Sequence, residues 1–381
     1  MIHALYLHIP FCHKICPFCS FAVCRDNPAK HAAYFELVKK EFDLLPPLDL
    51  SRIESIYFGG GTPSRLPLKT LTDWVEWLRK TVGVGVQTQW SIEANPEDLS
   101  PDYANGLARL GFKRISLGVQ SFQGQGLESL RRQHTPEDSR QAVANIHQAG
   151  IQDLNLDLMF GYPDQGIEDL EADLAAFKEC HPTHISAYCL NIEQRTPLFR
   201  QPQWQQWQDA NEALIAEMYQ RIVTFLARQG YRQYEISNFA LDGYQSLQNL
   251  VNWGGQDYLG LGMGAHSLVS SQRWGNHRRW VDYRKALQSD HLPRQYQETL
   301  DLTQKRDERL MLTLRQTKGL DLSEFESCFD VNVSAVWGSK LDQLKTAGLV
   351  KLDQQRMQLT LPGMLLADEI TAVLAAMLAN L

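Results

Sequence analysis

Short apolar segments alternate with amphipathic segments through the first half of this 381-residue chain. The apolar segments are rich in Ile, Leu, Val and aromatic residues, as expected of strands that are buried on both faces. They predict strands at 4–11, 55–60, 89–95, 114–122, 153–160 and 184–192. Six strand–helix units in series indicate an α/β fold, in which parallel strands joined by right-handed crossovers form a partial (β/α)6 barrel.

The helix boundaries between these strands carry local signals. SPDY (100–103) and TPED (135–138) each place an N-cap hydroxyl before a proline at the first helical position. Gly111 and Gly150 follow amphipathic segments at the positions where helices should end. After the last of these strands, the pattern predicts one long helix over 205–230.

The remainder of the chain changes character. Residues 252–267 are glycine-rich and predict a loop or hairpin region. From about residue 303 the pattern predicts three helices, two short strands and a final helix, which together resemble a small α+β winged-helix module. We therefore expect a barrel domain at 1–235, a connecting glycine-rich segment at 236–302 that completes the active face, and a winged-helix-like domain at 303–381.

Composition and charge limit the classes of function. The chain is 44% hydrophobic and 21% charged, as globular proteins are. Its net charge of -7 argues against a nucleic-acid partner in spite of the winged-helix-like end. The N-terminal MIHALYLHIPF lacks the basic and apolar regions of a secretory signal, and no apolar run is long enough to span a bilayer. We expect a cytoplasmic protein; peripheral membrane contact and a homodimer stay open.

Three cysteines stand close together in FCHKICPFCSF, after the first predicted strand. Cys12, Cys16 and Cys19 are spaced C-x3-C-x2-C at the end of a strand, where a β/α barrel places its chemistry. In a cytosolic chain they indicate a metal site rather than disulfides. Zinc with His8 or His13 as fourth ligand is one alternative. The other is an iron–sulfur cluster, which normally takes four thiolates and would leave one iron open to a small chelating ligand.

Polar residues also stand at the ends of later strands. Glu93, Gln120, Asp157 and Asn191 follow apolar segments in the third to sixth predicted strands. A carboxylate in such a place is costly unless it is paired. Each residue taken singly could be a satisfied structural group, but four polar residues at the carboxyl ends of successive strands indicate a ligand site.

Six sequence blocks occur in order between residues 6 and 163: YLHIPFCHKICPFC, YFGGGTPS, SIEANPE, GVQSF, LRRQH and DLMFGYP. These blocks resemble the oxygen-independent coproporphyrinogen III oxidase family of the radical S-adenosylmethionine (SAM) superfamily. GLGMGAHS and the C-terminal module extend the resemblance to nearly the whole chain. The resemblance implies a radical SAM barrel whose three motif cysteines bind a [4Fe–4S] cluster, with the methionine amine and carboxylate of SAM on the fourth iron.

The resemblance also implies a set of SAM-binding residues. They are Tyr6, Phe18, Gly60, Gly61, Thr62, Glu93, Gln120, Arg132, Asp157, Asn191 and His266. The glycines at the end of the second strand allow backbone to approach a ligand closely, and the lack of GK[ST] argues against a phosphate-binding loop. The sequence assigns no residue a catalytic role.

The family that this chain resembles has an oxidase branch and a haem-chaperone (HemW-type) branch. Phe21 occupies the position of an additional cysteine in the oxidase motif. Only eleven residues precede Cys12, where the oxidase carries a long N-terminal extension. Both differences favour the chaperone, which binds haem and transfers it to apo-haemoproteins such as respiratory enzymes. The alternatives are an enzyme (the oxidase or another radical SAM enzyme acting on a tetrapyrrole) and a regulatory protein built around the C-terminal module.

The haem-binding motif of the chaperone branch is matched only in part. Chaperones of this branch commonly carry H-N-x-x-Y-W, and the aligned segment here is QNLVNW. Asn249 and Trp253 match, whereas Gln248 replaces the histidine, and an amide is a poor substitute for imidazole on haem iron. We expect these three residues and His266 to contribute to haem binding, with His277 a weaker candidate.

Overall fold

The computed structural model describes residues 1–353 and 355–379, and its centre is a 12-stranded mixed sheet. Six neighbouring parallel strands form the middle of this sheet. They are β1 (Ala4–Ile9), β4 (Ser55–Gly60), β5 (Gln89–Ala94), β6 (Arg114–Gln120), β7 (Asp153–Phe160) and β8 (His184–Cys189). They lie side by side in chain order. The predicted α/β fold with six consecutive parallel strands is confirmed.

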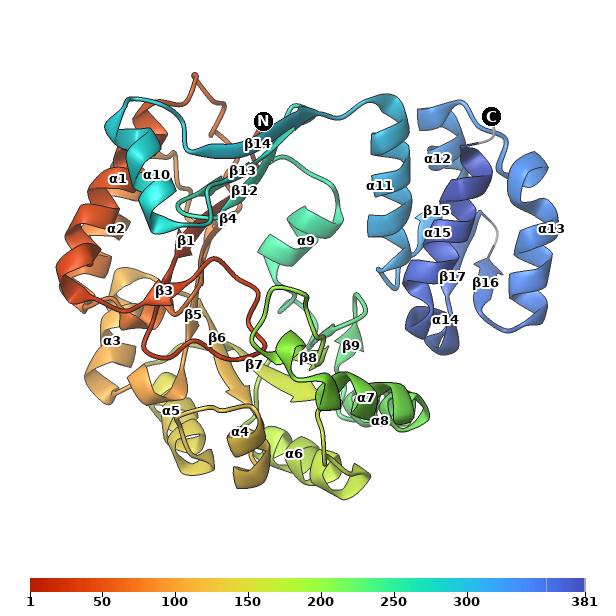
Figure 1. The fold of residues 1–381 in the computed structure, drawn as a ribbon, viewed down its shortest axis with the longest axis horizontal. Helices are drawn as coiled ribbons and strands as arrows, with labels where there is room; N and C mark the ends of the chain where they lie inside the picture. Colours follow the sequence, from red (N-terminus) through yellow and green to blue (C-terminus); the bar gives the residue numbers. More distant parts are fainter. Residues whose placement is uncertain (354, 380–381) are drawn as a thin grey trace.

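Helices connect these strands and lie around the outside of the curved sheet (Figure 1). They are α1 (His31–Asp43), α2 (Leu68–Thr81), α3 (Pro101–Leu110), α4 (Gly124–Ser129), α5 (Pro136–Gln148) and α6 (Ile167–Glu179). The expected caps are present: the Ser100 hydroxyl accepts from the Tyr103 amide, and Thr135 and Asp138 form a capping box. Gly111 ends α3 in the left-handed conformation, with φ of 92°.

The helix predicted over 205–230 is two helices. They are α7 (Pro202–Ala210) and α8 (Glu212–Arg228). Asn211 separates them with non-helical backbone angles of -122° and 21°, and its side-chain amide donates to the Trp207 carbonyl at 2.7 Å. The prediction was wrong at this point because an asparagine can bond its own backbone neighbours and so compete with the helical pattern.

The glycine-rich region is part of the sheet rather than a loop beside it. Its strands and helices are α9 (Leu247–Trp253), β11 (Tyr258–Leu261), β12 (His266–Val269), β13 (Gln272–Asn276), α10 (Trp280–Gln288) and β14 (Arg294–Thr299). β11 pairs in parallel with β1, whereas β12 to β14 follow antiparallel. A side chain at Gly260 would place its Cβ 2.1 Å from the His266 carbonyl oxygen, so only glycine permits this close pairing.

Two short strand pairs complete the main body of the structure. Cys12 ends β2 (Phe11–Cys12), and Cys16 and Cys19 lie between β2 and β3 (Cys24–Arg25). β9 (Arg232–Gln233) and β10 (Asn238–Ala240) form the far edge of the main sheet. The core is built from the apolar strands, in which Ile56, Leu117 and Leu156 are fully buried. Within the described residues, no helix has both the length and the apolar character to cross a bilayer.

The C-terminal helices form a separate group beside the sheet (Figure 1). The elements are α11 (Leu302–Leu314), β15 (Leu320–Asp321), α12 (Leu322–Phe329), α13 (Val333–Thr346), β16 (Val350–Asp353), β17 (Arg356–Leu359), α14 (Leu361–Leu365) and α15 (Ala367–Leu378). Buried Trp337 anchors this group, donating its indole N–H to the Leu374 carbonyl. Backbone bonds from Ile236 to Arg315 and from Thr317 to Tyr234 join it to the sheet.

Candidate functional site

A cavity of about 390 Å³ lies at the carboxyl ends of the parallel strands. Eleven of the residues predicted from the sequence line this cavity. Parallel strands place their carboxyl ends at the same edge of a sheet, and this brings the residues at those ends together. They are Cys12, Cys16, Phe18, Cys19, Gly60, Gly61, Thr62, Glu93, Gln120, Arg132 and Asp157. The cavity therefore brings together the three motif cysteines and most of the polar residues at the strand ends.

The segment 12–24, which we name the cysteine loop, forms one wall of this cavity. Its thiols have polar neighbours: Thr62 Oγ1 donates to Cys12 Sγ at 3.7 Å, and Arg132 Nη1 donates to Cys16 Sγ at 3.3 Å. Burial raises the pKa of the Cys12 thiol to about 12, and burial also raises the pKa of Cys19. Thiolates form here only when a cation compensates the negative charge, and a bound metal does so.

The geometry disfavours the zinc alternative. Within residues 1–353 and 355–379, no three Cys, His, Asp or Glu side chains converge as ligands of a single metal ion. His8 is buried and both of its ring nitrogens are engaged, Nε2 with the Ala22 carbonyl and Nδ1 with the Tyr6 hydroxyl. His13 is exposed and does not line the cavity. In a four-iron cluster each thiolate binds a different iron, so the three sulfurs surround the cluster and need not meet at one metal ion.

Two glycines shape the floor beside the cysteines. Gly60 has φ of +112°, and a Cβ there would lie 2.6 Å from the His8 ring. A Cβ on Gly61 would lie 2.9 Å from Cys12 Sγ. A side chain at Gly60 would clash with the His8 ring and one at Gly61 with Cys12, so glycine lets the backbone of this cavity wall lie close to the cysteine loop.

Two carboxylates lie deeper in the cavity, and their hydrogen-bond donors are neutral. Glu93 accepts from the Gly60 amide at 3.0 Å and from the Tyr57 hydroxyl at 3.0 Å. Asp157 accepts from Asn155 Nδ2 at 2.8 Å. Burial raises the pKa of Glu93 to about 7, with the nearby Asp157 charge adding to the effect, and burial raises the pKa of Asp157 to about 6. A cationic or hydroxyl-bearing ligand would stabilise both ionised forms.

Arg132 also lines the cavity, with a guanidinium that has spare hydrogen-bonding capacity. Arg132 Nη2 donates to Asn95 Oδ1 at 2.7 Å and to the Gly118 carbonyl at 3.1 Å. The buried Nε of Arg132 has no partner among the described residues. Gln120 stands next to it with φ of 69°, a conformation that non-glycine residues adopt at a cost and that is common at ligand sites. An unpaired buried donor of this kind fits a ligand with acceptor atoms.

Three of the residues predicted to bind SAM lie outside the cavity. The sixth strand ends at Cys189, so Asn191 is in the following loop, where it is exposed and donates to Glu193. Tyr6 stacks on Tyr57, which lines the cavity, and bonds its hydroxyl to His8. Exposed His266 hydrogen-bonds to the Tyr296 hydroxyl. Sequence reasoning placed Asn191 in the site because the strand was read three residues too long.

Other lining residues were not predicted. They include Tyr57, Asn95, Ser116 and Tyr188. Tyr57 and Ser116 are polar groups inside otherwise apolar strands, and a buried polar group within a strand needs a partner. This pattern in the sequence could have identified both residues as candidates for the site.

Comparisons with known proteins agree with this geometry. Residues 6–177 match the radical SAM superfamily and residues 300–366 match the HemN C-terminal domain. The Lactococcus lactis protein named "Heme chaperone HemW" is 31% identical over 368 residues, which are 97% of this chain and 96% of that protein. This chain belongs to the HemW family.

Two further comparisons support the family and the fold. The HemW protein of Escherichia coli is 34% identical over 269 residues, 70% of each chain. The structure of E. coli coproporphyrinogen III oxidase (HemN) superimposes with a TM-score of 0.84 at 23% identity, covering 98% of this chain and 90% of that one. The radical SAM superfamily uses SAM and a [4Fe–4S] cluster, and the cysteines, the glycine floor and the free Arg132 donor fit both groups.

The segment 248–253, aligned with the haem motif, does not line this cavity. Gln248 is 4% exposed and donates to Asn252 Oδ1 at 3.2 Å, so its amide faces the protein. Asn249 and Trp253 line a second cavity of about 380 Å³, with residues of α11 on the opposite side. Asn249 Nδ2 donates to the Tyr234 hydroxyl at 3.2 Å. The predicted haem residues therefore divide between a buried amide, the second cavity and exposed His266.

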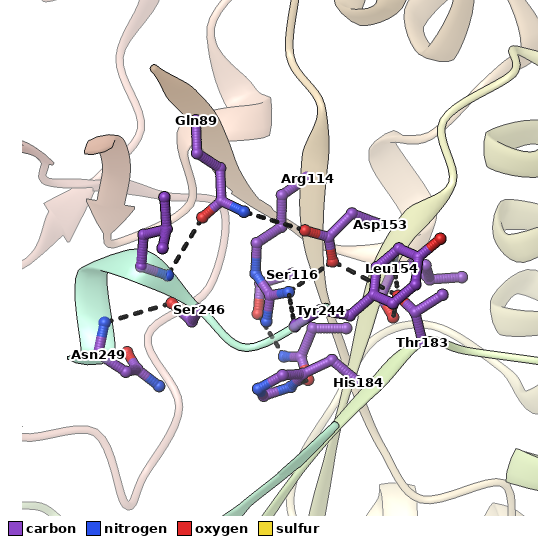
Figure 2. Close-up of polar contacts among 12 residues, drawn as sticks. Gln89, Arg114, Ser116, Asp153, Leu154, Thr183, His184, Tyr244, Ser246 and Asn249 are labelled. Carbon is purple, nitrogen blue, oxygen red and sulfur yellow. Dashed lines mark hydrogen bonds and ion pairs between the residues drawn. The ribbon is translucent and has the colours of Figure 1, made fainter. Parts of the chain in front are cut away.

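A buried polar network holds α9, the helix that carries this segment, against the amino ends of the strands (Figure 2). Arg114 and Asp153 form an ion pair of 2.5 Å, and Gln89 Nε2 donates to Asp153 at 3.1 Å. Arg114 Nη1 also donates to the Tyr244 carbonyl, and the Leu247 amide donates to Gln89 Oε1. The network thus fixes the chain just before α9 and the first turn of the helix.

Proposed function

We propose that this protein is a cytoplasmic haem chaperone that carries a SAM-chelated [4Fe–4S] cluster, binds haem and transfers it to apo-haemoproteins. The observation that carries the proposal is the end-to-end similarity to relatives named heme chaperones. Phe21 supports it, because this side chain lines the cavity at the position of the additional cysteine in the oxidase motif. A chaperone needs no catalytic turnover at the cluster. In this proposal the cluster stabilises the fold of the cysteine loop.

The cavity residues divide into two groups in this proposal. Cys12, Cys16 and Cys19 would each bind one iron, and Thr62 and Arg132 would donate hydrogen bonds to cysteine sulfurs. A cluster with SAM on its fourth iron supplies one-electron chemistry when both are bound. The glycine floor lets SAM approach the backbone, while the carboxylates bind its cationic and hydroxyl groups and Arg132 Nε binds an acceptor atom.

Retention of haem tests the proposal directly. The cluster is reconstituted without oxygen, one equivalent of haem is added, and the protein is passed through gel filtration. A stoichiometric Soret band should elute with the protein, and an added apo-globin should then take up that haem. A protein that keeps its cluster but elutes without haem would contradict the chaperone function.

The second candidate is oxygen-independent oxidation of coproporphyrinogen III, or another radical SAM reaction on a tetrapyrrole. The buried amide of Gln248 favours it, because the family's haem-binding histidine is replaced by a side chain that faces inward. The protein is incubated with coproporphyrinogen III, SAM and a strong reductant. Formation of 5′-deoxyadenosine together with the decarboxylated porphyrinogen would support the enzyme.

A further inference from the structure

A third, basic cleft lies beside the cysteine loop. Its volume is about 670 Å³, within the range of small-molecule sites. One wall is the exposed face of α10 with the segments that flank it, and the loop after β8 contributes the other wall. The basic lining residues are Arg195, His277, Arg278, Arg279, Lys285 and His291. Asp282 is the one acidic residue among those that line it.

Most of these basic groups lack a partner inside the protein. Arg279 lies 3.6 Å from Asp282, and Arg278 donates to the Ser20 carbonyl. In the part of the chain that the structure describes, no carboxylate lies within 4.0 Å of Arg195 or Lys285. A concentration of unpaired positive charge on a chain of net charge -7 favours an anionic ligand.

Both walls of the cleft are bonded to the cysteine loop. Arg278 bonds to the carbonyl of Ser20, one residue after the last motif cysteine. The Leu198 amide, in the loop that also carries Arg195, donates to the Pro17 carbonyl at 2.9 Å. A ligand in the cleft would therefore lie next to the segment that is proposed to hold the cluster.

Large apolar side chains stand exposed near the basic groups. Phe21, directly after Ser20, is 62% exposed, and Val281 on α10 is 53% exposed. His277 and His291 make no side-chain hydrogen bond with any described residue. The cleft and its surroundings thus offer a ligand three kinds of contact: cationic side chains, apolar surface, and imidazoles without a hydrogen-bond partner among the described residues.

We propose that this cleft binds the carboxylate edge of a tetrapyrrole. Arg195, Arg278 and Lys285 would bind the carboxylates, and His277 would bind the iron when the tetrapyrrole is haem. A tetrapyrrole combines an apolar ring with carboxylates at its edge, and haem iron takes imidazole as ligand. The inference rests on the proposed function, whose cargo is haem, and it supplies an iron ligand that buried Gln248 does not.

The test compares three ligands on the full-length, cluster-reconstituted protein. Haem has carboxylates and iron, protoporphyrin IX lacks the iron, and haem dimethyl ester lacks the free carboxylates. Wild type should bind both haem and protoporphyrin IX. It should bind haem dimethyl ester at least roughly tenfold more weakly, because the ester cannot form charge-assisted hydrogen bonds to the basic side chains. Coproporphyrin III, with four carboxylates, is the matched probe for an oxidase-type substrate.

Variants locate the site. Arg195→Gln with Lys285→Gln changes two exposed side chains on opposite walls and should weaken haem and protoporphyrin IX roughly tenfold or more. Arg221→Gln with Arg228→Gln on α8 is the matched control and should change neither affinity. His277→Ala should shift the Soret band of the haem complex and leave the affinity for protoporphyrin IX unchanged.

The outcomes separate this inference from the proposed function. Equal haem affinity in wild type and the Arg195/Lys285 variant would overturn the cleft while leaving the chaperone intact. Failure of wild type to bind haem would overturn the chaperone. If coproporphyrin III then bound to wild type but not to the variant, the cleft would stand as an enzyme substrate site. No binding of any porphyrin would overturn both.

Discussion

The two ends of the parallel sheet bury charged groups in opposite ways. At the amino ends, Arg114 and Asp153 pair with each other, and Gln89 completes the set of bonds around the carboxylate. At the carboxyl ends, Glu93 and Asp157 have only neutral donors. The same strands therefore carry an ion-paired network at one end and, at the other, carboxylates that are hydrogen-bonded but have no cationic partner among the described residues.

The difference indicates which end of the sheet binds a ligand. Buried charge without a partner is costly, and a protein can remove this cost with an internal ion pair, as Arg114 does. Burial raises the pKa of Asp153 as well, even beside Arg114. At the other end, where no cation pairs with the carboxylates, the pKa values of Glu93 and Asp157 reach about 7 and about 6, and Arg132 Nε has no partner among the described residues. Such groups at the carboxyl ends of barrel strands point to binding rather than to stability.

A hydrogen-bonded chain links the cavity to the α9 segment. The carboxylate of Asp157 accepts from Asn155 Nδ2, which leaves the Asn155 oxygen to accept from His184 Nδ1 at 2.6 Å. His184 Nε2 then accepts from the Tyr234 hydroxyl, whose oxygen accepts from Asn249. Burial lowers the pKa of His184 well below its usual value, so the ring is neutral and every donor points towards Asp157.

The largest effect is expected from the cysteines. Replacing Cys12, Cys16 or Cys19 by serine should each abolish the brown four-iron cluster, because three thiolates leave no reserve ligand. Iron content and the visible absorption after anaerobic reconstitution measure the loss. Cys328→Ser, at an exposed thiol of the C-terminal domain, is the control and should keep the full cluster. A normal cluster in any of the three variants would overturn the ligand set.

The ion pair and the cavity guanidinium should differ in stability. Arg114→Met leaves Asp153 buried and unpaired and should lower the free energy of unfolding by roughly 3–5 kcal/mol. Arg132→Met should cost only about 1–2 kcal/mol, because it removes hydrogen bonds at a solvent-accessible cavity. Urea unfolding of the metal-free proteins measures both. Equal losses of unfolding free energy in the two variants would contradict the distinction between the amino and the carboxyl ends of the strands.

Binding of SAM should release protons. Ionised Glu93 and Asp157 bind the cationic ligand better, whereas in the ligand-free protein their pKa values are raised to about 7 and about 6. Affinity should therefore rise as the pH rises from 5 to 8. Calorimetry in buffers of different ionisation enthalpy counts the protons. Glu93→Gln should weaken SAM roughly tenfold to a hundredfold and reduce the release; proton uptake would contradict the assignment.

The smallest effect is expected at Gln248. Restoring the family's histidine with Gln248→His should leave haem affinity and the Soret position nearly unchanged, because this side chain is buried and faces Asn252. A haem titration of both proteins measures the difference. A clear gain of affinity would show that the segment at α9, rather than the basic cleft, holds the iron.

Sequence patterns predicted the parallel core well. The strands at 55–60 and 153–160 have the expected bounds, because a continuous apolar run ended by glycine or a turn leaves little choice. Residues 252–267 were predicted as a loop or hairpin, and β11 does pair with β12, but its parallel pairing with β1 was not predicted, since four residues with a central glycine carry no signal for it. Pairing with a distant strand decides such a segment, and the local sequence does not encode it.

The candidate site was predicted through the positions of residues on strands. Glu93, Gln120 and Asp157 fall at the carboxyl ends of adjacent strands, so parallel pairing brings them together. Asn191 does not line the cavity because its strand ends two residues earlier, and His266 does not because its strand is antiparallel and its ring bonds to Tyr296; their predicted role in SAM binding stays a prediction. The basic cleft gave no local signal, because its walls are far apart in the sequence.

The most direct test is whether SAM binds to the cluster in this cavity. The anaerobically reconstituted protein is reduced, and its electron paramagnetic resonance spectrum is recorded with and without SAM. Addition of SAM should change the cluster signal in wild type and have a much smaller effect in Glu93→Gln at the same concentration. An identical spectrum in wild type with and without saturating SAM would contradict a ligand site at the carboxyl ends of the strands.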